Sequence, residues 1–304
     1  MSNVEQQYNL DSPLRVGTLF SGIGAFEEAL RQLGFPHEIK FACDTGEIEL
    51  IPLDDLKMRR EYKDLNRRVR NLNSEEKERH NTLKALIAER NDEIREHCYS
   101  LPNKQERTRY VNQLYRRYEG EKRNYVKDSY LANYDIDHDD FHTDIRFMRG
   151  DDYAGQVDIL VGGSPCQSFS TFGKKQGLED ARGTLFYDYA RIIQESNPKI
   201  FIYENVAAIK TNDHGHTWET MLSVWESLGY NIYHDVLNAV DYNHPQLRNR
   251  VFIVGIRKDI CHTPYKFPAK KKLPDVLIFY HYILQFMQIC AIIVFEKKCR
   301  FLLR

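Results

Sequence analysis

Cysteine is scarce in this chain and shows no grouping. The six cysteines lie at positions 43, 98, 166, 261, 290 and 299, with no Cys-x-x-Cys pair and no neighbouring cluster of cysteine and histidine. This spacing argues against a disulfide framework and a structural zinc site, so we expect no bound metal and a reducing, cytoplasmic environment. His214 and His216 form a close pair, but without an evident third ligand a polar loop is the simpler interpretation.

An excess of charge of one sign is also missing. The formal net charge is -1 over 304 residues, of which 42% are hydrophobic and 29% charged. This balance is typical of an ordinary globular protein with one large α/β domain or two small ones, and it gives no overall signal for nucleic acid. The N-terminal tail, residues 1–13, is polar and has no apolar core followed by a cleavage site, so we expect no secretory signal.

Short apolar runs alternate with amphipathic stretches along most of the chain. The runs expected to form buried strands are 14–19, 39–43, 157–161, 199–203, 231–237 and 250–256. Helical patterns lie between them at 25–33, 184–196 and 218–228. This alternation predicts the α/β class, with a doubly wound, mostly parallel sheet.

One segment, about 54–131, departs from this alternation. It carries apolar side chains at three- and four-residue steps, and between Asp54 and Ser129 it holds 20 Lys/Arg against 15 Asp/Glu. The segment is too long for a simple connection, so we expect a helical insertion with two arms separated at Pro102. Its arginines at 59, 60, 67, 68 and 70 either follow DNA phosphates or form a solvated helix face, the commoner case.

Two predicted strands end in residues that suit a nucleotide-like ligand. The first runs into Phe20-Ser21-Gly22-Ile23-Gly24, a glycine turn before a helix, where backbone N–H groups favour an anionic group. The turn lacks the full G-x-G-x-x-G spacing, so an ordinary tight turn remains open. The second strand ends in Asp44, which either holds a ribose hydroxyl or caps a turn.

Two further strands end in residues that suit covalent chemistry. Cys166 follows the 157–161 strand, and Pro165 restricts the backbone before it. Its thiol is either a nucleophile or a buried structural group. Glu204 follows the 199–203 strand. Ligands in such sheets bind outside the carboxyl ends of the strands, so one cleft could hold all these residues.

Five ordered blocks resemble those of the cytosine-5 DNA methyltransferase family. They are Phe20–Gly24, Pro165-Cys166-Gln167, Arg182–Phe186, Glu204-Asn205-Val206 and Gln246–Arg250. The resemblance runs from Leu14 to about Arg257, apart from the insertion. It implies a catalytic domain over 14–272 with the fold of S-adenosylmethionine-dependent methyltransferases. It also implies that the cofactor is S-adenosylmethionine, that the substrate is double-stranded DNA, and that the protein acts in a restriction–modification system.

The resemblance also implies roles for individual residues. Phe20, Ser21, Gly22 and Gly24 would hold the methionine part of S-adenosylmethionine, Asp44 its ribose, and Asp144 and Ile145 its adenine. Cys166 would add to carbon 6 of a flipped cytosine, which makes carbon 5 able to take the methyl group. Glu204 would engage the base, and Arg248 and Arg250 would position Cys166 and the base.

The chain departs from the family pattern at its C-terminal end. Family members usually continue with a target-recognition domain and a closing cofactor segment, whereas the tail 273–304 carries an apolar run at 276–295. A truncated or frame-shifted coding end is one interpretation, and a split enzyme with a second chain for recognition is another. A membrane helix is less favoured, because polar residues interrupt the run and basic residues flank it. Two functional alternatives stay open, a fragment inactive alone and a cytosine-5 tRNA methyltransferase.

Overall fold

A seven-stranded sheet organises the protein, with the strand order β3-β2-β1-β4-β5-β7-β6. The structure is a computed structural model that describes all residues except 1–11, 121, 166–184, 243–245, 261–263 and 271–304. Its strands are β1 (Leu14–Leu19), β2 (His37–Cys43), β3 (Phe141–His142), β4 (Ile159–Gly162), β5 (Ile200–Val206), β6 (Tyr230–Asn238) and β7 (Asn249–Arg257).

The sheet is mostly parallel, as the sequence predicts. Strands β3, β2, β1, β4 and β5 pair in parallel, and β7 runs antiparallel to both β5 and β6. The six predicted strands are confirmed, although β5 extends through Val206 because its ladder with β7 continues that far. Glu204 therefore lies inside a strand rather than after it. The two-residue strand β3 was not predicted, since it is too short to show a pattern.

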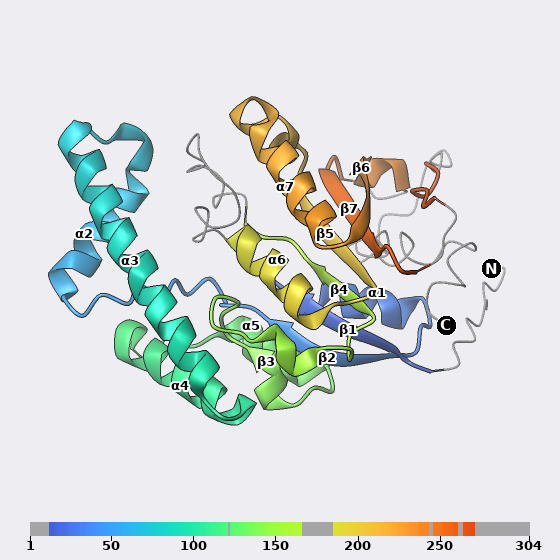
Figure 1. The fold of residues 1–304 in the computed structure, drawn as a ribbon, viewed down its shortest axis with the longest axis horizontal. Helices are drawn as coiled ribbons and strands as arrows, with labels where there is room; N and C mark the ends of the chain where they lie inside the picture. The colour runs from blue at the N-terminus through green and yellow to red at the C-terminus, as the bar shows by residue number, and fades with distance from the viewer. Residues whose placement is uncertain (1–11, 121, 166–184, 243–245, 261–263, 271–304) are drawn as a thin grey trace.

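Helices cover both faces of this sheet. Figure 1 shows α6 (Leu185–Ser196) and α7 (His216–Ser227) on one face and α1 (Ala25–Gln32) on the other. Successive strand residues point to opposite faces, so β5 sends Phe201 to the core under α6 and α7 and Ile202 to the core under α1. Because both faces of these strands are buried, the strands appear in the sequence as continuous apolar runs.

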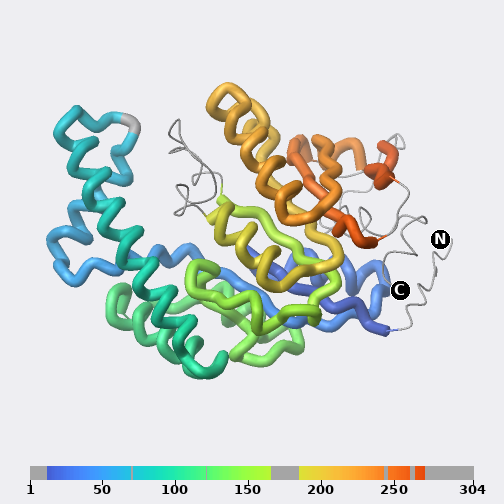
Figure 2. The backbone as a smooth tube through the Cα atoms, viewed as in Figure 1, coloured from blue at the N-terminus to red at the C-terminus, as the bar shows by residue number. Residues whose placement is uncertain are grey.

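The segment between β2 and β3 is helical, as predicted. It consists of α2 (Leu56–Arg67), α3 (Ser74–Ser100), α4 (Lys104–Glu119) and α5 (Tyr125–Asn133). Figure 2 shows the chain leaving the sheet after β2, building these helices at its side and returning to the sheet edge. The break at Pro102 separates α3 from α4.

The helices α2–α4 and α5 pack in different ways. Apolar side chains of α2–α4 form two clusters of their own with residues 48–53 and Phe147. In contrast, Tyr130 of α5 packs against Ala42 and Phe141 of the sheet. Thus α5 covers the sheet, whereas α2–α4 project beyond it. We refer to α2–α4 as the helical arm.

Short 3-10 helices complete the described secondary structure. They are Val69–Asn71, His138–Asp140, Gly150–Tyr153, Ala207–Lys210, Asn212–Gly215 and Ala239–Tyr242. No helix in the described part of the chain is both long and apolar enough to cross a membrane. The apolar run at 276–295 lies outside the described residues.

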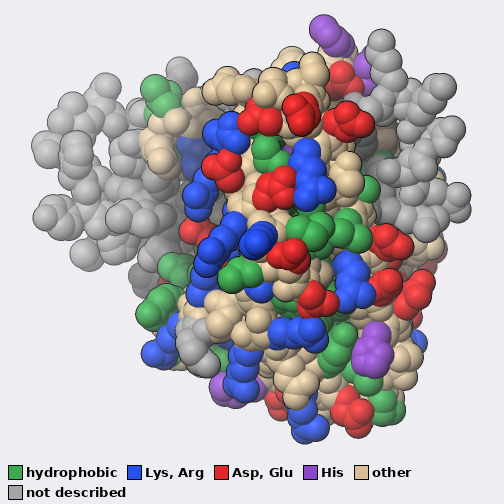
Figure 3. Space-filling model, turned by 90° about the vertical axis from the view of Figure 1, so that its left-hand side faces the viewer, with side chains coloured by type: hydrophobic (Ala, Val, Ile, Leu, Met, Phe, Trp, Pro, Cys, Tyr) green, Lys and Arg blue, Asp and Glu red, His purple; other side chains and the backbone are tan. Residues whose placement is uncertain are grey.

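The surface of the helical arm carries charges of both signs. Figure 3 shows this side of the molecule, where Lys and Arg side chains are interspersed with Asp and Glu. Arg59 donates to the carbonyl oxygen of Tyr118 at 2.6 Å, and Arg68 pairs with Asp64 and Glu76. Part of the arginine cluster therefore holds the arm together.

At the edge of the sheet opposite the predicted site, a buried carboxylate ties three strands together. Asp158, just before β4, accepts hydrogen bonds from the backbone N–H and the guanidinium of Arg15 on β1. Lys199, just before β5, lies 3.1 Å from the same carboxylate. Burial would raise the pKa of Asp158, but the hydrogen bonds from Arg15 and Lys199 outweigh it and lower the pKa.

We predict that Asp158→Asn lowers the free energy of unfolding by about 1–3 kcal/mol at pH 7, because three charge-assisted contacts are lost. The carboxylate has a lower pKa in the folded state than its usual 3.8, so its contribution is present in full above 3.8 and is lost as the pH falls from there through the lower pKa of the folded state. Denaturant unfolding from pH 7 to pH 3 should show the difference from wild type narrowing.

Asp259→Asn is the matched control. Asp259 pairs with Arg257 at 2.7 Å, but its side chain is 65% exposed, so this change should cost less than about 1 kcal/mol. Equal losses in the two variants would contradict the role given to Asp158.

Candidate active site

The residues that carry the predicted chemistry meet at one edge of the sheet. Leu19 of β1 pairs with Cys43 of β2 and with Gly162 of β4, and Gly162 pairs with Tyr203 of β5. The residues that follow, Phe20, Asp44, Gly163 and Glu204, therefore lie side by side. The strand order reverses between β1 and β4, and such a switch point is where doubly wound sheets bind ligands.

The glycine turn after β1 has a constrained backbone. Phe20, Gly22 and Gly24 all have positive φ angles, of 54°, 55° and 86°. Phe20 is the unusual member, because a residue with a side chain rarely adopts this conformation. At Gly24 a Cβ would lie 2.1 Å from the ring of Tyr134, whose hydroxyl donates to the Gly24 carbonyl oxygen at 2.5 Å. Only glycine fits this position.

Asp44 links this turn to the end of β2. Its Oδ2 accepts the N–H of Gly22 at 2.9 Å, and its Oδ1 accepts the N–H of Gly46 at 2.8 Å. Ser21 joins the same ends, since its N–H donates to the carbonyl oxygen of Cys43 at 3.1 Å. A carboxylate has about four acceptor positions, so Asp44 can still accept two hydroxyl groups.

The Asp144 carboxylate is buried in an ion pair. Oδ2 lies 2.6 Å from Nη2 of Arg146 and accepts the Tyr115 hydroxyl of α4 at 2.8 Å, while Oδ1 accepts the Arg146 N–H at 3.0 Å. Ile145 is buried in the core beneath α6, and its carbonyl oxygen accepts Arg191 at 2.6 Å. The structure therefore places both residues after β3, next to the strand that ends before Asp44, but engages the Asp144 carboxylate with protein donors.

Glu204 faces two arginines across the sheet. Nε of Arg250 lies 2.9 Å from Oε1 of Glu204, and Nη2 of Arg248 lies 3.9 Å from the same oxygen. The antiparallel course of β7 explains this meeting, because it brings Arg250 opposite Val206 at the carboxyl end of β5. Burial raises the pKa of Glu204, and this effect outweighs the opposing charges of Arg250 and Arg248.

The loop that leads toward Cys166 is anchored on β5. Ser164 is buried, its hydroxyl lies 2.6 Å from the Tyr203 hydroxyl, and its carbonyl oxygen accepts Nδ2 of Asn205 at 2.9 Å. A Cβ at Gly163 would lie 2.1 Å from the carbonyl oxygen of Glu204, so this close approach requires glycine. Cys166 itself lies outside the described residues. Two residues before it, Ser164 is held against β5, the strand that carries Glu204.

Sequence reasoning missed several residues that shape this edge. Glu27, which follows the glycine turn, is buried and accepts the hydroxyls of Thr18 at 2.7 Å and Tyr130 at 2.5 Å. Burial raises its pKa against these two hydrogen bonds. No periodicity reveals such a partnership, because Tyr130 is 103 residues away.

Two large apolar side chains at this edge are exposed. Ile23 of the turn is 64% exposed, and Leu247, next to Arg248, is 84% exposed. Exposed apolar residues are common singly on protein surfaces. Their positions within two of the five sequence blocks nevertheless mark them as ligand-facing candidates that the sequence did not single out.

Comparison with known proteins points to one family. The family model described as C-5 cytosine-specific DNA methylase matches residues 116–277. The type II methyltransferase M.Sau96I of Staphylococcus aureus is 45% identical over 125 residues, which are 40% of this chain and 29% of that protein. The type II methyltransferase M1.ScrFI of Lactococcus lactis subsp. cremoris is 44% identical over 143 residues, 46% of this chain and 36% of that protein.

The similarity to solved structures is lower. A crystal structure of the Dnmt2 methyltransferase of S. pombe aligns with 83% of this chain and 52% of its own, at 17% identity and a TM-score of 0.43. The chain spans about a third of the length of the curated relatives it matches.

The raised pKa of Glu204 generates a prediction for stability. A carboxyl group whose pKa is higher in the folded than in the unfolded state stabilises the fold fully below its usual pKa of 4.5, and this contribution is lost as the pH rises. The Glu204→Gln variant has no carboxyl group to ionise at this position, so it does not lose this stability as the pH rises. The free energy of unfolding of the variant, relative to wild type, should therefore increase from pH 4 to pH 8 in urea titrations.

Glu89→Gln, a change on the exposed surface of α3, should show no such trend. A difference between Glu204→Gln and wild type that stays constant, or becomes more negative at high pH, would contradict the burial argument.

Proposed function

The chain belongs to the C-5 cytosine-specific DNA methylase family, and from this premise we propose that it transfers a methyl group from S-adenosylmethionine to carbon 5 of cytosine in DNA. The observation that carries the proposal is the meeting of Glu204 with Arg250 and Arg248 on the strand that anchors Ser164. An acid with a raised pKa, beside the loop of a single cysteine, suits covalent catalysis on a base.

The turn and Asp44 fit the cofactor chemically. Among the described residues other than its chain neighbours, no atom lies within 4 Å of a Cβ built at Gly22, so this part of the structure leaves room above the turn. Phe20, Ser21, Gly22 and Gly24 would hold the methionine part, and Asp44 would accept the ribose hydroxyls. The loop of Asp144 and Ile145 would line the adenine side. When bound, S-adenosylmethionine supplies an electrophilic methyl group on a sulfonium.

The protein's own residues would make the base reactive. The Cys166 thiolate forms a bond to carbon 6 of cytosine, and the electron pair of the 5,6 double bond becomes available at carbon 5. Glu204, in its protonated form, donates its proton to ring nitrogen 3 and so neutralises the charge that would otherwise develop there. After methyl transfer, a water molecule accepts the carbon 5 proton and the electron pair of that bond restores the 5,6 double bond. The cysteine leaves as a thiolate, and ring nitrogen 3 returns its proton to Glu204.

Arg250 has two roles in this scheme. Its guanidinium fixes the Glu204 carboxyl group through Nε, and its charge, with that of Arg248, favours the thiolate of a nearby cysteine. Carbon 5 cannot be reached within a stacked duplex, so the target base must be flipped into the site. Exposed Leu247, beside Arg248, is placed to contact the opened DNA.

We further propose that this activity protects DNA in a restriction–modification system, in the cytoplasm of the cell that holds this DNA. The relatives named as type II methyltransferases support this setting. Recognition of a target sequence would come from residues or a second chain beyond the catalytic edge described above.

A covalent trapping experiment tests the proposal. Mixed-sequence duplex DNA made with 5-fluorocytosine cannot lose the carbon 5 substituent, so Cys166 should stay bonded to the base in the presence of S-adenosylmethionine. We expect a protein–DNA adduct that survives denaturing electrophoresis. Cys166→Ser should abolish the adduct, and Glu204→Gln should lower methyl transfer by about 10²-fold, because general acid catalysis is lost.

The assay should be run with the chain alone and with a target-recognition chain supplied in trans. A transfer RNA with 5-fluorocytosine provides the competing substrate. Adduct formation on the RNA but not on the DNA would show that the substrate is transfer RNA and would overturn the proposal for DNA. Cofactor binding without any adduct under both conditions would refute the proposed chemistry.

A further inference from the structure

We infer that the helical arm, α2–α4, is part of the cofactor site, with Tyr115 and Asn124 as positioning residues that set the affinity for S-adenosylmethionine. The inference rests on the proposed function, since it takes the edge at Asp44 and Asp144 as the place where the cofactor lies. Tyr115 reaches the Asp144 loop from α4, and Asn124 reaches Asp44 from the point where the arm returns to the sheet.

Tyr115 is one of the few donors that hold Asp144. The Asp144 side chain is 1% exposed, and its oxygens accept the Tyr115 hydroxyl together with the backbone N–H and guanidinium of Arg146. A buried carboxylate keeps its place only while its donors remain, because an unsatisfied acceptor is costly. The arm therefore contributes one of the hydrogen bonds that keep the Asp144 carboxylate in place.

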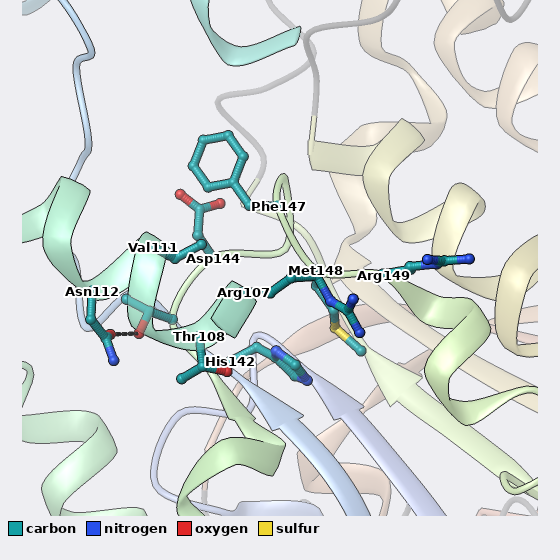
Figure 4. A pocket seen from close by; sticks show the side chains of 10 residues that line it. Arg107, Thr108, Val111, Asn112, His142, Asp144, Phe147, Met148 and Arg149 are labelled. Atoms are coloured by element: carbon teal, nitrogen blue, oxygen red, sulfur yellow. Dashed lines mark hydrogen bonds between the residues drawn. The ribbon is translucent and has the colours of Figure 1, made fainter. Parts of the chain in front are cut away.

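The rest of the loop after Asp144 also packs on the arm. Figure 4 shows Thr108, Val111 and Asn112 of α4 lining a small pocket with Asp144, Phe147 and Met148 on its other side. Tyr99 of α3 donates to the Met148 carbonyl oxygen at 3.3 Å. The loop expected to line the adenine is thus held between α6 and the arm.

Asn124 joins the two ends of the arm at the cofactor edge. Its Nδ2 donates to the carbonyl oxygen of Asp44 at 2.9 Å, and its Oδ1 accepts the N–H of Lys127 as the N-cap of α5. A Cβ at Gly46 would lie 2.2 Å from this Oδ1, so glycine is needed where the chain leaves the sheet. The turn that presents the Asp44 carboxylate is consequently fixed by the residue that follows the arm.

These contacts bear on both sides of the cofactor site at once. The Asp44 turn and the Asp144 loop follow neighbouring strands, β2 and β3, and each is tied to the arm or its return by a side-chain hydrogen bond. Loss of either bond should loosen one wall of the site without removing any atom that touches the cofactor. The expected effect is weaker cofactor binding, accompanied by some loss of fold stability because a buried acceptor loses a donor.

The first test compares Tyr115→Phe with Tyr118→Phe in the full chain. Both tyrosines lie on α4 in the same apolar cluster, with 8% and 7% exposure, but the Tyr118 hydroxyl donates to Asp54, away from the site. Calorimetric titration with S-adenosylmethionine should show affinity reduced roughly 3- to 10-fold in Tyr115→Phe and unchanged in Tyr118→Phe. Hydrogen exchange of the cofactor-free protein should be faster at residues 144–148 in Tyr115→Phe alone.

The second test compares Asn124→Ser with Asn73→Ser. Serine is a good N-cap, so both variants keep their helix starts, α5 and α3 respectively. Asn124→Ser loses the donor to Asp44, and we expect a similar loss of cofactor affinity with faster exchange at residues 44–46. Asn73→Ser lies at the far end of the arm and should bind like wild type.

The outcomes separate the inference from the proposed function. A wild-type chain that fails to bind S-adenosylmethionine would overturn the proposed function and this inference with it. Wild-type binding with equal affinities in Tyr115→Phe and Tyr118→Phe would overturn the inference alone. Tighter binding by Tyr115→Phe would also overturn it, because Tyr115 would then compete with the cofactor for Asp144.

Discussion

The reversal of strand order between β1 and β4 is the constraint on which the site depends. Because β2, β1, β4 and β5 are parallel neighbours, the residues after them are forced to one edge, whatever their separation in sequence. Phe20 and Glu204 thus lie at the same edge of the sheet, on either side of the end of β4. The antiparallel β7 then supplies Arg250 to this edge from a strand that runs the other way.

Buried polar groups support this edge from below. Glu27 bridges Thr18 and Tyr130 beside the Phe20–Gly24 turn, and Tyr203 with Asn205 holds Ser164. Such networks are costly when a member is missing, so they favour a single arrangement of the backbone. The site is rigid where its loops leave the strands, and its acidic group carries a pKa raised by the same burial.

The helical arm shows how a long segment can be added without disturbing the sheet. It buries its own apolar side chains in separate clusters, and it leaves and rejoins the sheet at Asp44 and Asn124. Its charges of both signs suit a solvated surface, whereas its inward contacts reach Asp144. The arm therefore has apolar clusters of its own and contacts the Asp144 loop through α3 and α4.

Local periodic patterns predicted six of the seven strands and the main helices in their order along the chain, because buried strands and amphipathic helices leave such patterns, whereas the two-residue strand β3 does not. It also pointed to Phe20, Asp44 and Glu204, since each follows or ends an apolar run, and to Cys166, which lies outside the described residues. The pairing of Asp144 with Tyr115, the burial of Glu27 and the meeting of Glu204 with Arg250 were decided by the tertiary structure. These contacts join residues 29, 103 and 46 positions apart, or depend on strand direction, and neither leaves a trace in local sequence.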